Sequence, residues 1–201
     1  PDDNTNPGGG RGSAIHASGV ENFNITDSVF MSNSSEGNST QTAGAIMHLV
    51  GGTLYVDSCL FENNYSDCFG GAICSLSDES RIENCTFNRN SASVGGAVYY
   101  QRWDSSHTLT NNSFLENSAN VVSGWANDPA TGGALCVHQD GTVVIENCSF
   151  IDSVAADFND KKEPASSGGA IAAIQSDALF LLVNSCLFET NKADYGGHGG
   201  G

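Results

Sequence analysis

Positively charged residues are scarce in this chain. Only 7 of its 201 residues are Lys or Arg, against 23 Asp and Glu, which gives a formal net charge of −16 at pH 7. Such a balance repels both phosphate backbones and anionic lipid surfaces. We therefore expect no nucleic-acid partner and no anionic membrane surface as a partner, and a solvated exterior that attracts cations.

Long hydrophobic runs are also missing. No 18 consecutive residues are apolar, so the sequence predicts no segment that spans a bilayer. No segment places apolar residues at helical spacing either. The β-prone runs are short, and polar pairs such as Glu83-Asn84 and Thr110-Asn111 interrupt them. This pattern indicates strands of a few residues each.

What the chain does contain is one motif repeated along its whole length: Gly-Gly-Ala and a branched aliphatic, followed later by Phe-x-x-Asn. The clean copies of the first part begin at Gly70, Gly95, Gly132 and Gly168, with looser ones at Gly12 and Ala43 and a degenerate one at Gly196. The phenylalanines are Phe30, Phe61, Phe87, Phe114, Phe150 and Phe188, and the residues three further on are Asn33, Asn64, Asn90, Asn117, Ser153 and Asn191. A period in this range indicates stacked units rather than one globular core.

The spacing within the repeat is fixed in one part and variable in the other. From a Gly-Gly-Ala element to the next phenylalanine the distance is 17 to 20 residues, whereas from that phenylalanine to the next element it is 8 to 18. Insertions thus collect at one place, near residues 31–42, 115–131 and 151–167. In stacked repeats such insertions form loops on one face, where a local function would lie.

These features predict an all-β fold, a right-handed parallel β-helix of about six to seven coils with three short strands per coil. Coils of parallel strands rise about 4.8 Å each, so like residues should lie over like. The six phenylalanines are then the core ladder, the asparagines an internal amide ladder, and Gly-Gly-Ala a crowded corner or one that needs positive φ. Leucine-rich repeats are the competing solenoid, but their Leu-x-x-Leu-x-Leu frame is absent.

The paired Gly-Gly-Ala-[Ile/Val/Leu] and Phe-x-x-Asn motifs resemble the repeats of polymorphic outer membrane proteins, known best from chlamydial surface autotransporters. The resemblance covers essentially the whole chain. It implies a β-helical passenger that is secreted or held at the cell surface and is commonly adhesive or structural. It supplies no catalytic residues.

The unbroken repeat predicts a single domain over residues 1–201. The chain opens on Pro1 and closes on Gly199-Gly200-Gly201, where another coil should begin, so we expect an excerpt of a longer protein. The bare ends of a β-helix expose unpaired strand edges. Stacking on further repeats, or end-to-end self-association into a fibre, is therefore expected.

The seven cysteines are an odd number, so at least one has no partner within the chain. Cys59, Cys85, Cys148 and Cys186 occupy one column of the repeat. Thiols in register on neighbouring coils have Cβ atoms near 4.8 Å apart, beyond the preferred disulfide span. The column is compatible with buried reduced thiols and with disulfide bridges. Cys68 is the candidate to form a disulfide with Cys74 or with another chain.

Seven Asn-x-Ser/Thr sequons are present, and each is a candidate glycosylation site if the chain passes through a eukaryotic secretory pathway. Asn84, Asn111 and Asn147 share a polar corner column and should face outward, and Asn38 lies in an inserted loop. The weaker acceptors are Asn24, Asn33 and Asn64, of which the last two belong to the inward asparagine ladder.

Exposed aromatic residues could stack on a sugar, and Tyr55, Tyr65, Trp103 and Trp125 are the candidates, although such residues more often simply pack in loops. The regular phenylalanines belong to the core instead. The five histidines, His16, His48, His107, His138 and His198, share no column, so we expect no metal site. Acidic residues between Asp152 and Asp160 could hold adventitious calcium, and no other cofactor is expected.

Enzyme chemistry has little support in the sequence. Gly197-His198-Gly199 resembles the Gly-His-Gly of β-helical polygalacturonases, but the acid pairs and basic residue that accompany it there are missing from the middle coils. We expect a non-enzymatic extracellular scaffold, adhesive or fibre-forming, with a cell-surface or glycan receptor. The alternative is a carbohydrate-active β-helix enzyme, a polysaccharide hydrolase or lyase.

Overall fold

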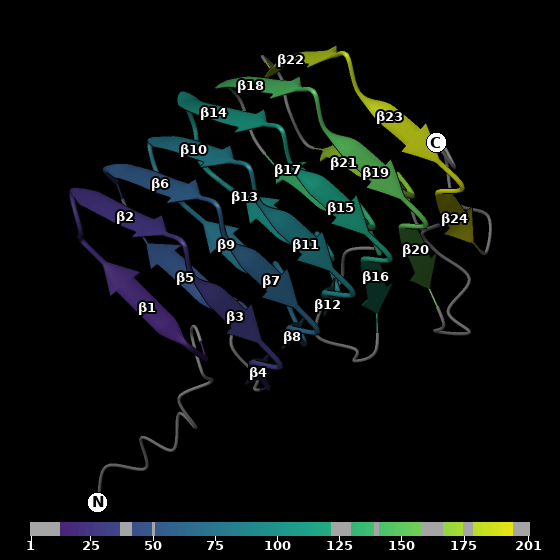
Figure 1. Ribbon diagram of the computed structural model, residues 1–201, viewed down its shortest axis with the longest axis horizontal. Helices are drawn as coiled ribbons and strands as arrows, with labels where there is room; N and C mark the ends of the chain where they lie inside the picture. Colours follow the sequence, from purple (N-terminus) through teal and green to yellow (C-terminus); the bar gives the residue numbers. More distant parts are fainter. Residues whose placement is uncertain are drawn as a thin grey trace, which may run out of the picture.

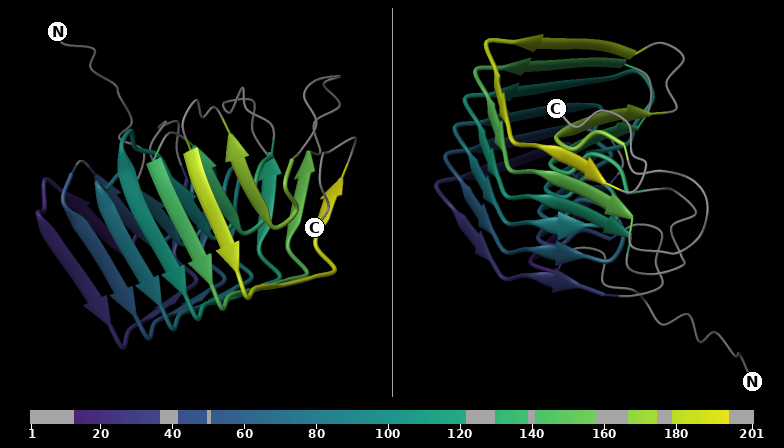
Figure 2. Two further views of the ribbon diagram at one scale, coloured as in Figure 1. Left: turned by 90° about the horizontal axis from the view of Figure 1, so that it is seen from above. Right: turned by 90° about the vertical axis from the view of Figure 1, so that its right-hand side faces the viewer.

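The computed structural model describes residues 13–36, 42–49, 51–121, 130–138, 141–157, 167–174 and 179–194. These residues form 24 short strands and no helix, arranged as four parallel sheets of six strands each (Figure 1). Four consecutive strands make one coil, and the six coils superpose when the molecule is viewed along the stack (Figure 2). The fold is a parallel β-helix, as the repeat predicted.

The strands of each sheet come one from each coil. Sheet A contains β1 (Ile15–Ser18), β5 (Ile46–Leu49), β9 (Ile73–Ser75), β13 (Val98–Tyr100), β17 (Leu135–His138) and β21 (Ile171–Ile174). Sheet B contains β2 (Asn22–Thr26), β6 (Thr53–Asp57), β10 (Glu79–Glu83), β14 (Ser105–Thr110), β18 (Gly141–Glu146) and β22 (Leu179–Asn184). Sheet C contains β3 (Val29–Met31), β7 (Leu60–Glu62), β11 (Thr86–Asn88), β15 (Ser113–Leu115), β19 (Ser149–Ile151) and β23 (Leu187–Glu189). Sheet D contains β4 (Ser34–Ser35), β8 (Tyr65–Ser66), β12 (Ser91–Ala92), β16 (Ser118–Val121), β20 (Val154–Asp157) and β24 (Lys192–Asp194).

Each coil has four strands rather than the three that the sequence predicted. The additional strand is that of sheet D, and in three coils it lies inside a range predicted as an inserted loop: β4 within 31–42, β16 within 115–131 and β20 within 151–167. These strands are short and rich in serine and alanine, so no run of β-prone residues marks them. The insertions begin only after sheet D, and each one connects it to sheet A of the next coil.

The six phenylalanines form one continuous stack inside the coil. Neighbouring ring centroids are 4.7 to 5.0 Å apart and the rings are parallel to within 6°. This distance is the spacing of parallel strands, because each ring sits on the strand of sheet C directly paired with the next. The sheet B column Ile25, Val56, Ile82, Leu109, Ile145 lies beside the stack, all buried.

Two corners of every coil are turned by a non-glycine residue with positive φ. Between sheets B and C this residue is Asp27, Ser58, Asn84, Asn111, Asn147 or Ser185, and between sheets C and D it is Ser32, Asn63, Arg89, Glu116, Asp152 or Thr190, with φ from 48° to 56°. Asn and Asp tolerate this left-handed conformation best, which explains the polar residue before each Cys-x-Phe.

The corner that leads into sheet A requires glycine for two different reasons. Gly95 has a φ of 64°, and a Cβ on it would lie 2.4 Å from the carbonyl oxygen of Val98. Gly96 lies between coils, where a Cβ would approach the carbonyl oxygen of Gly133 to 2.1 Å. The first glycine of the motif therefore supplies backbone freedom, and the second allows neighbouring coils to reach their normal spacing.

The asparagines after the phenylalanines form a directional hydrogen-bond ladder. Asn64 donates from its backbone N–H (3.1 Å) and its Nδ2 (2.9 Å) to Oδ1 of Asn90. Asn90 in turn donates from its backbone N–H (2.9 Å) and its Nδ2 (3.1 Å) to Oδ1 of Asn117. The second proton of each Nδ2 goes back to the preceding coil, as from Asn90 to the Phe61 carbonyl at 3.0 Å. In the fifth coil Ser153 replaces asparagine, and its buried Oγ has no hydrogen-bond partner.

From the second coil to the fifth, sheet A is buried on both faces, which the sequence did not predict. Met47, Cys74, Tyr99 and Cys136 form the column between the two inward columns of this sheet, so they point away from the interior, yet each is at most 1% exposed. They pack with Phe69, whose ring stacks on Tyr99 at 4.4 Å. Ala43, Phe69 and Val94, which lie in connections from sheet D to sheet A, thus help to cover this face and form a second apolar cluster with it.

Candidate functional site

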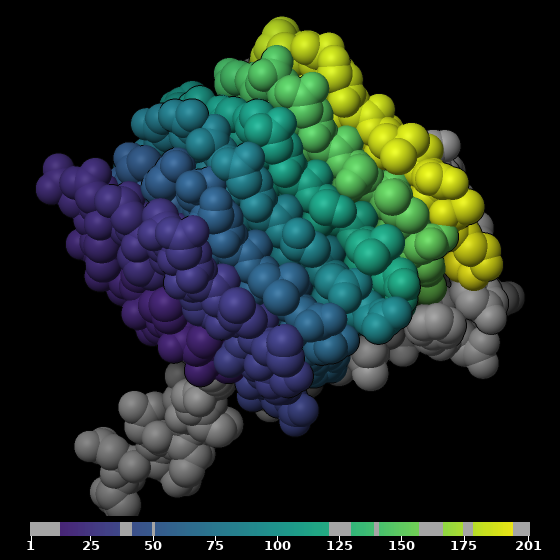
Figure 3. Space-filling model, in the orientation of Figure 1, coloured from purple at the N-terminus to yellow at the C-terminus, as the bar shows by residue number. Residues whose placement is uncertain are grey.

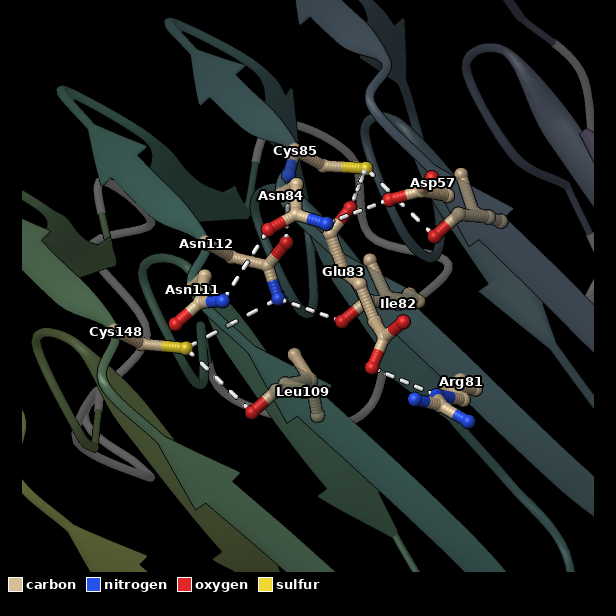
Figure 4. A network of polar contacts seen from close by, with 11 residues as sticks. Asp57, Arg81, Ile82, Glu83, Asn84, Cys85, Leu109, Asn111, Asn112 and Cys148 are labelled. Atoms are coloured by element: carbon tan, nitrogen blue, oxygen red, sulfur yellow. Dashed lines mark hydrogen bonds and ion pairs between the residues drawn. The ribbon is translucent and has the colours of Figure 1, made fainter. Parts of the chain in front are cut away.

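The outer corner between sheets B and C carries a regular row of polar side chains. Asn84 donates from Nδ2 to Oδ1 of Asp57 at 2.7 Å, and Asn111 donates to Oδ1 of Asn84 at 3.2 Å (Figure 4). These bonds link three successive coils on the exposed side. On the inner side of the same corner, Asn112 accepts from the Cys85 N–H at 2.9 Å and donates to the Ile82 carbonyl at 2.8 Å.

The sequon asparagines fall into two groups. Asn84, Asn111 and Asn147 are exposed at the outer corner, and Asn24 is exposed on β2. Asn64 is buried in the ladder and Asn33 is half-buried at its first rung. Asn38 lies outside the described residues.

All seven cysteines are thiols. Cys59, Cys85 and Cys148 are buried in one inward column, where the Cys59 N–H donates to Sγ of Cys85 at 3.4 Å. Burial raises the pKa of Cys85 to about 12 and that of Cys148 to about 11. Reactive cysteines instead have a lowered pKa and some exposure, so these thiols fill space. Cys68 is half-buried, and burial raises the pKa of buried Cys74 well above its usual range.

Only one of the four sugar-stacking candidates is largely exposed in the described residues. Trp103, in the turn between β13 and β14, has 60% of its surface open to solvent. Tyr55 and Tyr65 are half-buried on sheets B and D. Trp125 lies outside the described residues. The structure therefore brings no aromatic pair together as a sugar platform among the described candidates.

None of the acidic side chains that the structure describes is buried, and only a few of them pair with cations. Arg89 contacts Glu116 at 2.7 Å, Arg81 contacts Glu83 at 2.7 Å, and Arg102 contacts Asp78 at 2.6 Å. Within the described ranges no three His, Cys, Asp or Glu side chains lie close enough to hold a metal ion. Asp152, in the expected calcium loop, forms a corner on the exterior, whereas Asp160 of that loop and His198 lie outside those ranges.

A buried polar cluster at the junction of sheets A and B was not anticipated. The rings of Tyr100 and His107 stack at 4.0 Å, and His107 Nδ1 shares a 2.8 Å hydrogen bond with Ser80 Oγ. Burial lowers the pKa of His107 to about 3 and raises that of Tyr100. The Tyr100 hydroxyl and His107 Nε2 have no hydrogen-bond partner. The period of the repeat carries no signal for this pair, because neither residue recurs in its column.

The hollow next to this cluster is small. It is lined by Tyr100, Arg102, Ser105, His107, Val137, His138, Val143 and Leu179, and it has essentially no space even for a water molecule. Ligand pockets usually have about 300–1,000 Å³. The site therefore lacks the room that a sugar substrate needs.

The sixth coil is the last that the structure describes, and its inward apolar columns are more exposed than those of the middle coils. In Figure 3 the yellow atoms at one end of the molecule belong to β22, β23 and β24 of this coil. Val183 and Phe188 continue the columns of buried Ile145 and Phe150, but they are 40% and 38% exposed. At the other end Ile25 and Phe30 are only 7% and 8% exposed. The two ends thus differ in how much apolar surface they show.

Comparison with known proteins agrees with this architecture. Residues 3–150 match the family described as "Right handed beta helix region". The chain belongs to this right-handed β-helix family. No curated protein and no solved structure matches the chain. The family establishes the fold and its hand, and it is compatible with a structural scaffold. In the described residues no helix is long and apolar enough to cross a membrane.

Proposed function

We propose that this right-handed β-helix is a non-enzymatic extracellular scaffold, a stiff segment of a cell-surface or fibre-forming protein that displays its insertions to a receptor. The observation that carries the proposal is the placement of all three long insertions between sheet D and sheet A, on a stack whose interior is filled by continuous side-chain ladders. A filled interior is rigid, and loops held on such a support commonly bind partners.

The chemistry of the exterior is consistent with this role. The side chains of Glu83, Glu116 and Asp78 contact arginines rather than converging on a shared groove. The hydrolase alternative needs two carboxyl groups about 5–10 Å apart across a substrate cleft. The resemblance to polymorphic outer membrane protein repeats adds the expectation of a surface passenger. The scaffold requires no cofactor, and its acidic exterior argues against nucleic-acid partners.

The proposal includes N-linked glycans on the exposed outer corner. Asn84 and Asn111 use their Nδ2 atoms in bonds to the preceding coil, and adjacent coils lie only about 4.8 Å apart. Neighbouring glycans would therefore crowd each other, and Asn147 is the best-placed acceptor of the column. Intact mass before and after deglycosylation of the secreted protein measures this directly. An unmodified mass would remove glycans from the proposal and leave the scaffold.

The decisive experiment separates the insertions from the coils. In one variant, residues 37–41, 122–129 and 158–165 are removed, so that the three long connections, 36–45, 122–134 and 158–170, become as short as the connection between β12 and β13. In the matched control the same residues are replaced by a Gly/Ser segment of unchanged length. Both should keep the β-sheet circular dichroism of the parent, while binding to an array of glycans and extracellular-matrix proteins is lost in both.

Two results would contradict the scaffold. The first is binding that survives in the shortened variant, which would place recognition on the coils. The second is turnover of a polysaccharide, detected as new reducing ends or as the ultraviolet absorbance of unsaturated uronates. That result would establish the carbohydrate-active alternative.

A further inference from the structure

The turn of residues 101–104 connects β13 to β14 in the fourth coil and is fastened to the coil before it. The Gln101 N–H donates to the Ser75 carbonyl at 3.1 Å, and the Arg102 guanidinium contacts the Asp78 carboxylate at 2.6 Å. This ion pair lies on the exterior, with the Arg102 side chain 34% and the Asp78 side chain 54% exposed. Exposed ion pairs add little stability, so the turn can open at a small cost in free energy.

The turn forms part of the wall of the small hollow above Tyr100 and His107. Both of these side chains are only 1% exposed, and the hollow has essentially no space for a water molecule. Seven of the eight residues that line the hollow lie on strands, and Arg102 alone lies outside one. The turn is therefore the part of this wall that can move without breaking a sheet, and its movement would admit water to His107.

The closed hollow suits a neutral imidazole and not a charged one. His107 Nδ1 shares a 2.8 Å hydrogen bond with Ser80 Oγ, while Nε2 has no hydrogen-bond partner. An imidazolium donates from both ring nitrogens, so a proton on His107 would leave a buried charged donor unpaired. Burial accordingly lowers the pKa of His107 to about 3.

The groups around His107 offer no counter-ion for a proton taken up there. The titratable or charged side chains that line the hollow with it are Tyr100 of β13, Arg102 of the turn and His138 of β17. The other strands packed against the ring contribute side chains that do not titrate, namely Ser80 of β10, Val143 of β18 and Leu179 of β22. An imidazolium would thus meet the guanidinium of Arg102 and no carboxylate in the hollow, which adds like-charge repulsion to the cost of burial.

We infer that the turn of residues 101–104 is an acid-sensitive lid, closed over His107 while the imidazole is neutral and opened when the imidazole takes up a proton. Opening admits water to the imidazolium and moves Arg102 away from it, so it relieves both costs. The rest of the coil keeps its sheets, because only the turn has to move. This device goes beyond the proposed scaffold function and does not depend on it.

The pH range of the switch follows from the two states of the histidine. An imidazole in contact with water titrates near 6.5, whereas the pKa of His107 in the closed state is about 3. Between these values the open state binds one proton more than the closed state. The ratio of open to closed molecules should therefore rise as the pH falls, by about 70-fold between pH 6 and pH 4, and should be independent of pH above about 7.5.

Native-state hydrogen exchange measured by NMR tests the lid. The reporter is the Gln101 N–H, which is bonded across the turn, and the reference is the Asn90 N–H, which is bonded to Asn117 inside the stack. Gln101 should be less protected than Asn90, should lose about 70-fold in protection between pH 6 and pH 4, and should not respond to low urea, because a local opening exposes little surface. Equal protection and equal urea dependence of the two amides, or protection of Gln101 that does not change with pH, would overturn the inference.

Two phenylalanine substitutions assign the response to its histidine. His107→Phe should abolish the pH dependence at Gln101, whereas His48→Phe, which replaces another buried histidine outside the hollow, should keep it. Circular dichroism checks that both variants are folded. The same response in His107→Phe as in the parent, or its loss in His48→Phe, would overturn the assignment.

A fluorescence measurement follows the turn without changing His107. The chain has two tryptophans, so Trp125→Phe leaves Trp103 of the turn as the single emitter. The anisotropy of its emission should fall between pH 6 and pH 4, while the β-sheet circular dichroism stays constant. Anisotropy that falls only together with the circular dichroism would show acid unfolding of the whole domain and would contradict the lid.

Discussion

Asn117 accepts two hydrogen bonds from Asn90, at 2.9 Å from the backbone N–H and 3.1 Å from Nδ2, but the next coil places Ser153 where another asparagine would continue the ladder. The shorter side chain leaves a buried hydroxyl without a hydrogen-bond partner. The ladder resumes at Asn191, which donates to the Phe150 carbonyl at 2.8 Å. Ser153 is thus a single defect in an otherwise repeated network.

Ser153→Asn should therefore stabilise the protein. The new carboxamide would accept from Asn117 and donate to Asn191, and buried hydrogen bonds of this kind contribute about 1 kcal/mol each. In a domain of this size, each 1 kcal/mol of added stability corresponds to a rise of about 2–4 °C in Tm. Ser153→Ala is the control, because it removes the unpaired hydroxyl without extending the ladder. Equal melting temperatures for the two variants would show that the ladder adds no stability.

Loss of a ring from the phenylalanine stack should destabilise the protein most when the ring lies in the middle of the stack. Phe114 is fully buried with a ring on each side, so Phe114→Ala should lower the free energy of unfolding by about 3–5 kcal/mol. Phe188→Ala should cost clearly less, because that ring is 38% exposed and, among the described residues, stacks on Phe150 alone. Urea denaturation measures both. Similar losses for the two variants would contradict the stacked arrangement of the rings.

Acid should destabilise the fold through its buried histidines. Burial lowers the pKa of His107 to about 3, and it also lowers that of His48, whereas an imidazole in the unfolded chain titrates near 6.5. Between these values the unfolded chain binds more protons, so the free energy of unfolding rises with pH, by about 1.4 kcal/mol per pH unit for each fully shifted histidine.

The comparison of His107→Phe with the parent isolates this contribution. The variant keeps a flat ring against Tyr100 and should lose the His107 share of the slope between about pH 4 and 6. Unfolding curves at several pH values provide the measurement, and an identical slope in His107→Phe and the parent would refute the assignment.

Thiol labelling should divide the seven cysteines by burial. Cys68 and Cys186 are the half-buried ones and should be alkylated in the native protein at pH 8, whereas Cys59, Cys85 and Cys148 should react only after unfolding, because burial raises the pKa of each. Mass spectrometry after differential alkylation distinguishes the two groups. Rapid labelling of Cys85, or a Cys68–Cys74 disulfide, would disagree with the structure.

The sequence was sufficient for the features that recur with the period of the repeat. Phe87 and Phe114 could be placed over each other because each occupies the same position in its repeat, and a parallel strand stack superposes equal positions. The need for glycine at Gly95 and Gly96 followed from the same reasoning. Features confined to one coil carried no such signal.

Three features were missed for physical reasons. The strand β12 has only two residues, Ser91 and Ala92, so its sequence shows no β propensity and its pairing depends on the neighbouring coils. Phe69 covers Tyr99 on the outer face of sheet A. The position of Phe69 depends on the path of the loop that carries it, which the repeat does not specify. The Tyr100–His107 pair joins residues of two sheets, and their contact depends on the corner between them.

The central claim is that like side chains lie over like through six coils and fill the interior completely. An experimental crystal structure that measures the spacing of the six phenylalanine rings tests it most directly. The account predicts five consecutive centroid distances between 4.7 and 5.0 Å with nearly parallel planes. Rings separated by more than about 7 Å, beyond the range of aromatic contact, or rings facing solvent in the middle coils, would contradict it.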